Sequence, residues 1–224
     1  MAVTDVGSFS PQAVRALGPV HSVRPRVVPD PPVVDLPAAE EAAGALLRAL
    51  GCPVLSEAMA DTAQRMVRAY AEFLAPAEFD LTTFPNEERY DELVLARSIP
   101  VQSLCEHHML PFVGVAHVGY LPGERIVGLS KLARVVDLFA RRPQVQERLT
   151  KQVADWLRET LAPQGVGVVI EAEHTCMTLR GIRAAGSTTV TSTLLGTIRS
   201  DSRSRAEFLA LTTGPPNGLG GRRG

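Results

Sequence analysis

The chain has 224 residues, 45% of them hydrophobic and 21% charged, which suits one globular domain with further helices or tails around it. Its formal net charge of −1 gives no overall attraction to nucleic acid or anionic membranes, so an anionic ligand must be bound by a local basic cluster. No apolar run approaches the about 20 residues of a membrane span. The N-terminus does not resemble a signal peptide, and there are only three cysteines. These features predict a cytoplasmic protein without a nucleic-acid or membrane partner.

Both ends of the chain are predicted to lie outside the folded domain. Seven prolines fall within residues 1–37, and proline interrupts helices and strands because it lacks an amide N–H and restricts the residue before it. This segment is therefore predicted to be a disordered arm. Residues 213–224 begin with Thr-Gly-Pro-Pro, contain further glycines and are predicted to be a flexible tail.

Residues 38–92 are predicted to form an N-terminal helical region. Apolar residues recur at helical spacing over residues 38–50 and 56–74, as Met66 and Phe73 do in the second segment. Such spacing places the apolar side chains on one face, so each helix is expected to pack through that face.

Residues 93–212 are predicted to form one α+β domain. Strand and helix patterns follow one another in blocks, which favours an antiparallel sheet covered on one face by two helices. The predicted elements are strands over residues 93–99 and 112–120, helices over 130–142 and 145–161, strands over 166–173, 176–182 and 187–193, and a helix over 203–211.

Two cysteines and a histidine form a candidate metal site. Cys105 and His108 are three residues apart, so one turn of chain directs both at the same ion, and Cys176 supplies a second thiolate from a distant segment. Two sulfurs and one nitrogen suit zinc, and a fourth, open position would bind water, whose pKa zinc lowers to about 7. The alternative is a closed structural site completed by Cys52, which also suits a small buried hydrophobic position.

The segment around Cys176 carries further candidates. If residues 174–180 are extended, alternate side chains share one face. The residues on that face are His174, Cys176, Thr178 and Arg180. The face then presents an acid–base group, a metal ligand and an anion-binding guanidinium, whereas the alternative is an ordinary polar row in solvent.

Two helix starts carry candidate substrate-binding residues. Ser130 suits an N-cap, and the free N–H groups of a helix start attract anions, as do the nearby Lys131 and Arg134. Gln146 and Glu147 lie in the first turn of the next helix, where a carboxylate could accept from the N1–H and exocyclic amine of guanine. The alternatives are a solvated basic face and an acidic residue that complements the helix dipole.

These segments together resemble the GTP cyclohydrolase I family. Order and spacing are kept from about residue 38 to residue 211. The matching stretches are residues 103–108 (Ser-Leu-Cys-Glu-His-His), 127–134, 141–150, 173–176, 180–183 and 205–209.

The resemblance implies the tunnelling fold, in which subunits join their sheets into a barrel and two rings stack. The expected assembly is a homodecamer with active sites between subunits. GTP is the implied substrate, and the implied cofactor is Zn²⁺ held by Cys105, His108 and Cys176.

The resemblance also implies the reaction. Zinc-activated water adds to C8 of GTP while His107 protonates N7; the imidazole ring then opens and C8 leaves as formate. His174 handles protons near the ribose, and Ser130 assists rearrangement of the opened ribose. Ring closure gives 7,8-dihydroneopterin triphosphate, the first intermediate of tetrahydrofolate and pterin biosynthesis.

The same resemblance assigns guanine binding to Gln146 and Glu147. The residues implied to bind the triphosphate are Lys131, Arg134, Arg180, Arg65 and Arg68. The family motif Thr-Pro-x-Arg-x-x-Lys reads Thr-Ala-Gln-Arg-Met-Val-Arg over residues 62–68, so Arg68 stands where lysine is common. A planar guanidinium there replaces a point charge, which keeps the charge and changes the geometry of binding.

Other functions remain as alternatives. A paralogue that serves a specialised purine-derived pathway, leading to a deazapurine or a pterin, would begin with the same reaction and is not separable by sequence. A structural zinc protein would not need His107 or Glu147. Nitrile reductases of the tunnelling fold lack the Cys-Glu-His-His run, and pyruvoyl-pterin synthases bind zinc through three histidines, a pattern that this chain does not offer.

Overall fold

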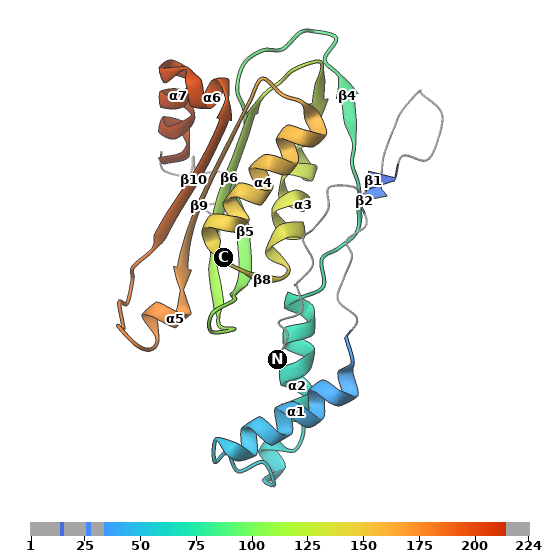
Figure 1. Cartoon of the computed structure of the whole chain (residues 1–224), viewed down its shortest axis with the longest axis vertical. Coiled ribbons are helices and arrows are strands. Elements are labelled where there is room, and N and C mark those ends of the chain that lie inside the picture. The colour runs from blue at the N-terminus through green and yellow to red at the C-terminus, as the bar shows by residue number, and fades with distance from the viewer. Residues whose placement is uncertain (1–13, 16–25, 28–33, 214–224) are drawn as a thin grey trace, which may run out of the picture.

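The computed structural model describes residues 14–15, 26–27 and 34–213, and its centre is a five-stranded sheet (Figure 1). The strand order is β10-β9-β6-β5-β8, and every neighbouring pair is antiparallel except β5 with β8. The strands are β5 (Val94–Cys105), β6 (Pro111–Leu121), β8 (Pro143–Gln144), β9 (Gly165–His174) and β10 (Thr189–Gly196). The predicted α+β architecture is confirmed.

Helices α3 (Leu129–Ala140) and α4 (Gln146–Leu161) cover one face of this sheet. Their apolar side chains recur at helical spacing, so one stripe of each helix is buried, as Leu132 and Leu149 are. Alternate side chains of β6, among them Phe112 and Val118, complete the core and are wholly buried. The core therefore lies between the sheet and this helix pair, as predicted.

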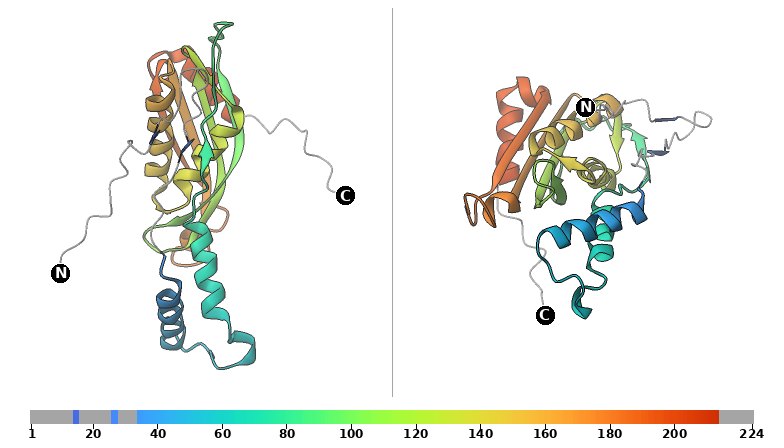
Figure 2. Two further views of the ribbon diagram at one scale, coloured as in Figure 1. Left: turned by 90° about the vertical axis from the view of Figure 1, so that its right-hand side faces the viewer. Right: turned by 60° about the horizontal axis from the view of Figure 1, so that its bottom comes forward.

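The opposite face is only partly covered. Helices α6 (Thr197–Ser200) and α7 (Ser202–Thr213) pack there, on the other side of the sheet from α3 and α4 (Figure 2). Phe208 of α7 fits against Gly167, because a Cβ at that glycine would lie only 2.7 Å from the phenyl ring. Further along the same face Val113 and Val190 remain 50% and 61% exposed.

The N-terminal helical pair projects beyond one end of the sheet (Figure 1). It consists of α1 (Leu36–Ala49) and α2 (Thr62–Phe73), with the 3-10 turn η2 (Glu57–Met59) between them. Helix α1 begins two residues earlier than predicted. The carboxylate of Asp35 accepts from the Ala38 amide at 3.1 Å, and Pro37 lies in the first turn, where its missing N–H costs no hydrogen bond.

Before residue 34, two parts of the predicted N-terminal arm are described, and both are short strands; the last two residues of the arm, Leu36 and Pro37, belong to α1. Strands β1 (Val14–Arg15), β2 (Arg26–Val27) and β3 (Phe79–Asp80) form a small sheet, and Val27 is only 4% exposed. The rest of the arm before residue 34, and the tail after residue 213, lie outside the described residues. A two-stranded sheet of β4 (Thr83–Pro85) and β7 (Arg125–Val127) completes the fold. Among the described helices, none combines the length and the hydropathy of a membrane-spanning segment.

Two local predictions are wrong. Residues 176–182 do not form a strand, because β9 ends at His174 and the chain turns into the short helix α5 (Thr175–Thr178). The four candidates from His174 to Arg180 are therefore not aligned by strand alternation. Ser130 is not the N-cap of α3; Gly128 takes that position, and Ser130 is the second residue of the helix. The Gly128 amide donates to Thr82 O at 2.9 Å, and this hydrogen bond holds the N-cap two residues before Ser130.

Candidate metal centre and active site

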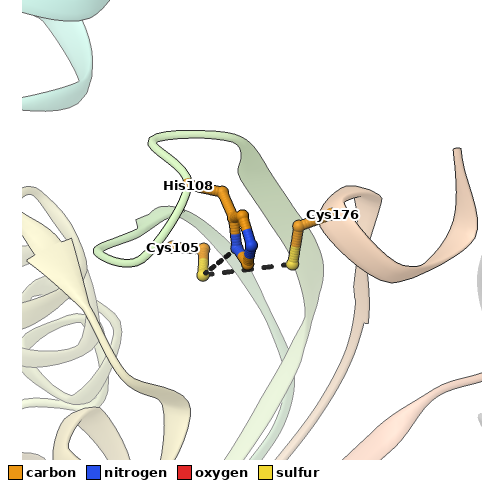
Figure 3. Close-up of side chains that lie close together, drawn as sticks. All are labelled: Cys105, His108 and Cys176. Atoms are coloured by element: carbon orange, nitrogen blue, oxygen red, sulfur yellow. Dashed lines mark hydrogen bonds between the residues drawn. The ribbon is translucent and has the colours of Figure 1, made fainter. Parts of the chain in front are cut away.

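The three predicted metal ligands lie together at the end of the sheet nearest the helical pair (Figure 3). Cys105 Sγ is 4.0 Å from Cys176 Sγ and 3.8 Å from His108 Nδ1. All three ligand atoms lie within 4.8 Å of one another. The side chains come from the last residue of β5, the β5–β6 turn and helix α5, and they point toward one space.

A tight turn explains how Cys105 and His108 meet. The Cys105 amide donates to Leu110 O at 2.8 Å, and the Met109 amide donates to Cys105 O at 2.8 Å. Met109 takes a left-handed conformation with φ of 53°, which reverses the chain between β5 and β6. The turn therefore returns His108 to the same side as Cys105.

Strand pairing brings in the third ligand. Strand β6 pairs with β9 in a register that places Phe112 opposite His174, so the end of β9 lies beside the start of β6. Thr175 then donates its hydroxyl to Pro111 O at 2.6 Å, and the following turn of helix directs Cys176 toward Cys105. The pairing of β6 with β9 thus brings together in space two cysteines that lie far apart in the sequence.

The spacing of the ligand atoms fits a tetrahedral ion. With metal–sulfur and metal–nitrogen distances of about 2.3 and 2.0 Å, two sulfurs lie about 3.8 Å apart and a sulfur and a nitrogen about 3.5 Å apart. The observed separations are 4.0 and 3.8 Å. These two pairs exceed the tetrahedral spacing only slightly, and the third pair, Cys176 with His108, lies within 4.8 Å.

No fourth histidine, cysteine, aspartate or glutamate joins this group in the part of the chain that the structure describes. Cys52, the rival fourth ligand, lies in the segment after α1 and is partly exposed. Its thiol does not belong to the group of ligand atoms within 4.8 Å of one another. The group is therefore a three-ligand set, as a catalytic metal centre requires.

The two cysteines are buried, whereas His108 is exposed. Burial raises the pKa of the Cys176 thiol, and so does the neighbouring Cys105; the more distant charge of Arg180 lowers the pKa by a smaller amount. The Cys176 thiol is thus a poor thiolate on its own. A bound cation would favour the deprotonated ligand forms, which couples metal binding to proton release.

His107, the predicted proton donor, lies beside the ligand set without belonging to it. Its Nδ1 is 4.0 Å from Cys105 Sγ, and its ring is edge-on to that of His108 at a centroid separation of 6.4 Å. The side chain is exposed. A ligand bound at the open side of the metal group would therefore be within reach of this imidazole.

His174 is held in a more ordered setting. Its ring is stacked on Phe112, with centroids 4.5 Å apart and planes 11° apart, and its Nε2 lies 2.8 Å from Gln146 Oε1. Burial lowers the pKa of His174, with a smaller opposing effect of Glu147. The imidazole is therefore neutral at neutral pH.

The candidates for substrate binding surround this cluster on several elements. Gln146 and Glu147 open α4 as predicted, with Gln146 buried and Glu147 exposed. The basic candidates are Lys131 and Arg134 on α3, Arg180 after α5, and Arg65 and Arg68 on α2. Within residues 34–213, no hydrogen bond or ion pair joins any of these basic residues to the metal ligands.

Three supporting contacts were not predicted from the sequence. Phe112 supports the ring of His174, Tyr70 donates to Met109 O at 3.1 Å in the metal-site turn, and Arg148 forms an ion pair with Glu106. The position of Glu106 beside the ligands and the position of Arg148 at a helix start were visible in the sequence. Nothing in the sequence showed that these two elements meet.

Comparison with known proteins places the chain in a family. A family model described as GTP cyclohydrolase I matches residues 39–213. "GTP cyclohydrolase 1" of Mycobacteroides abscessus is 53% identical over 184 residues, covering 80% of this chain and 90% of the relative. The enzyme of that name from Thermoanaerobacter pseudethanolicus is 48% identical, covering 80% of this chain and 97% of the relative.

A third relative, "GTP cyclohydrolase 1" of Thermobifida fusca, is 49% identical over 82% of this chain and 91% of the relative. Among solved structures, the apo form of an archaeosine synthase QueF-Like aligns with a TM-score of 0.38 and 17% identity, covering 46% of this chain and 93% of that chain. The family model and the curated relatives span most of the folded region, including the three-ligand group. The chain therefore belongs to the GTP cyclohydrolase I family.

Proposed function

We propose that this protein hydrolyses GTP to 7,8-dihydroneopterin triphosphate and formate, as a metal-dependent GTP cyclohydrolase I. The observation that carries the proposal is the convergence of Cys105, His108 and Cys176 in a chain about half identical to enzymes of that name. Three protein ligands leave one position for water, which hydrolysis of the imidazole ring requires.

We propose zinc as the metal. Two thiolates and one imidazole are the ligand types that zinc prefers, and the spacing of these atoms fits tetrahedral coordination. When bound, the metal supplies Lewis acidity that makes a water molecule nucleophilic at neutral pH. The three free cysteines also fit a cytoplasmic protein, because reducing conditions keep such ligands available.

The chain's own residues would handle the protons. His107, exposed beside the ligand set, is placed to donate to N7 of the purine as C8 is attacked. His174, neutral and held by two contacts, would transfer protons near the ribose. Ser130, exposed at the second position of α3, would assist rearrangement of the opened ribose.

Substrate recognition is proposed to divide between α4 and the basic residues. Glu147 is exposed and would accept from the N1–H and exocyclic amine of guanine, a pair of donors that adenine lacks. Gln146, expected beside it in guanine binding, has its side chain turned inward to His174. The residues proposed for the triphosphate are Lys131, Arg134, Arg180, Arg65 and Arg68.

We propose a homodecamer with active sites between subunits. Strand β10 has eight residues and lies at an edge of the sheet, where it can pair with another strand. On the sheet face opposite α3 and α4, Val113 and Val190 are exposed. An edge of this length suits the joining of sheets between copies of the chain. Arg65 is paired with Asp61 of its own helix and not with any of the three ligands, which is compatible with the same arrangement.

The test measures zinc per subunit, formate release and pterin fluorescence with GTP. Cys176→Ser should lose both metal and turnover, because a hydroxyl is a poor replacement for a thiolate ligand. His107→Ala should keep zinc and lose ring opening. Cys52→Ser is the matched control and should keep both; full turnover in Cys176→Ser, or loss of zinc in Cys52→Ser, would contradict the metal assignment.

A further inference from the structure

Gln146 is the most heavily hydrogen-bonded side chain near the proposed reaction centre. Its Nε2 lies 3.0 Å from Ile170 O, 2.9 Å from Thr189 O and 3.1 Å from Thr191 Oγ1. Its Oε1 lies 2.8 Å from His174 Nε2. The residue is only 2% exposed, so water does not compete for these groups.

The orientation of this amide is determined by its neighbours. The backbone carbonyls of Ile170 and Thr189 only accept hydrogen bonds, so the end of the Gln146 amide that faces them must be the NH₂ group. A reversed amide would place its oxygen against two carbonyl oxygens in a buried site, which is strongly unfavourable. The amide oxygen must therefore face His174.

A second consequence concerns the imidazole. The oxygen of Gln146 has no hydrogen to give, so the bond to His174 exists only when His174 Nε2 carries the hydrogen. In the neutral ring, Nδ1 is then the nitrogen with a free lone pair. Phe112, stacked at 4.5 Å, restricts tilting of the same ring.

We propose that Gln146 is a positioning residue, which fixes the orientation and the tautomer of His174 and leaves Nδ1 for the reacting ribose. This rests on the proposed function, in which His174 transfers protons. It also assigns the side chain of Gln146 to the catalytic step in place of a contact with guanine, which is left to the exposed Glu147.

Two of the groups that accept hydrogen bonds from Gln146 lie on the strand proposed to form the contact between subunits. Thr189 and Thr191 belong to β10, the strand proposed to pair with a neighbouring subunit. Thr191 is further fixed by Thr150 of α4, whose hydroxyl lies 2.6 Å away. The amide that orients His174 is thus anchored to the edge of the sheet.

The test separates positioning from guanine binding through kcat and KM. Gln146→Leu keeps the approximate volume and removes all four hydrogen bonds. A mispositioned proton-transfer group should lower kcat about 10- to 100-fold with little change in KM for GTP. Glu147→Gln should instead raise KM. A rise in KM without loss of kcat in Gln146→Leu would overturn the proposal.

A double-mutant cycle then asks whether Gln146 acts through His174. In a His174→Ala background, followed under single turnover with enzyme in excess, Gln146→Leu should change the rate by less than about threefold. Gln144→Leu is the matched control, because Gln144 is equally buried and bonds to Phe139 O and Gln152 but not to His174. Its effect should be the same with and without His174. Additive effects of Gln146→Leu and His174→Ala would refute the inference.

Folding and function are controlled separately. If Gln146→Leu does not give folded protein by circular dichroism, Gln146→Asn carries the same test, since it keeps an amide but draws it back by one methylene. If the wild-type protein binds zinc but does not turn over GTP, the proposed function fails. If the wild-type protein turns over GTP but the effects of Gln146→Leu and His174→Ala are additive, only the proposed role of Gln146 fails.

Discussion

Cys105, His108 and Cys176 come from three segments and meet within one chain. The basic residues proposed for the triphosphate come from α2, α3 and the turn after α5, and none of them forms a described hydrogen bond or ion pair with the three ligands. The ligands are brought together by backbone pairing: the β5–β6 turn and the β6–β9 register determine where each one lies. Four of these five basic residues are exposed and Lys131 is partly exposed; all except Arg180 are carried by helices. One chain therefore brings the three candidate metal ligands together by itself, whereas in our proposal the phosphate-binding surface would be completed by assembly of several copies.

Removal of the metal should have the largest effect on activity. Treatment with a strong chelator should abolish turnover and leave the secondary structure intact, because the ligands stand on a sheet with its own buried core. The measurements are formate release, circular dichroism and zinc content, and added Zn²⁺ should restore activity. Unfolding of the metal-free protein would show that the ligand set does not preform, unlike the arrangement described above.

Removal of a phosphate contact should have a smaller effect. Arg180→Ala should raise KM for GTP about 10- to 100-fold, since a charge-assisted hydrogen bond contributes about 1.5–3 kcal/mol. Zinc content should stay unchanged, because Arg180 affects Cys176 only through its charge. Arg203→Ala, an exposed arginine on α7 at the other end of the sheet, is the control and should leave KM unchanged. Loss of zinc in Arg180→Ala would place this residue with the metal centre.

The same contrast explains what the sequence predicted well. Helical and alternating apolar patterns located α1, α3, α4, β6 and β9 to within a few residues, because burial on one face imposes a period. The helix predicted over residues 56–74 begins only at Thr62, because residues 57–59 form the separate turn η2. The Cys-x-x-His spacing and the distant Cys176 correctly named side chains that come together. Both predictions depend on short-range patterns or on chemistry that few residue types supply.

Other features depend on tertiary context and were not predictable. Polar alternation from His174 to Arg180 predicted a strand, but the same residues form a helical turn, which is too short to show a helical period. Ser130 has the chemistry of an N-cap, yet the pairing of β4 with β7 starts α3 at Leu129. Gln146 was expected at a guanine, and its inward bonds to β9 and β10 follow only from the packing of α4 on the sheet.

Mixing of two variant subunits would test whether Arg65 serves the active site of a neighbouring subunit. Arg65 lies on α2 of the projecting helical pair and forms an ion pair with Asp61 at 3.0 Å. If it serves the site of a neighbouring subunit, Arg65→Ala and His107→Ala proteins that are denatured and refolded together should regain about a quarter of the wild-type sites by random pairing. At a GTP concentration far below the KM of the Arg65→Ala protein, each variant refolded alone should stay nearly inactive. No recovery in the mixture would place both residues in the site of one chain.

The smallest expected effect lies where the helical pair meets the metal-site turn. The Tyr70 hydroxyl donates to Met109 O at 3.1 Å. This hydrogen bond joins α2 to the segment that carries His107 and His108. Tyr70→Phe removes only this bond and should lower stability by about 1 kcal/mol, or Tm by about 2–4 °C.

Zinc content should remain, because the β5–β6 turn keeps its own backbone hydrogen bonds, and turnover should fall by less than about threefold. Tyr90→Phe is the matched control, since the Tyr90 side chain is half exposed and its hydroxyl makes no hydrogen bond among the described residues. Differential scanning calorimetry at a fixed protein concentration, with zinc and formate assays, compares the two. A large loss of zinc in Tyr70→Phe alone would mean that the helical pair helps to form the metal centre, which would remove the distinction between a self-contained centre and an assembly-dependent surface.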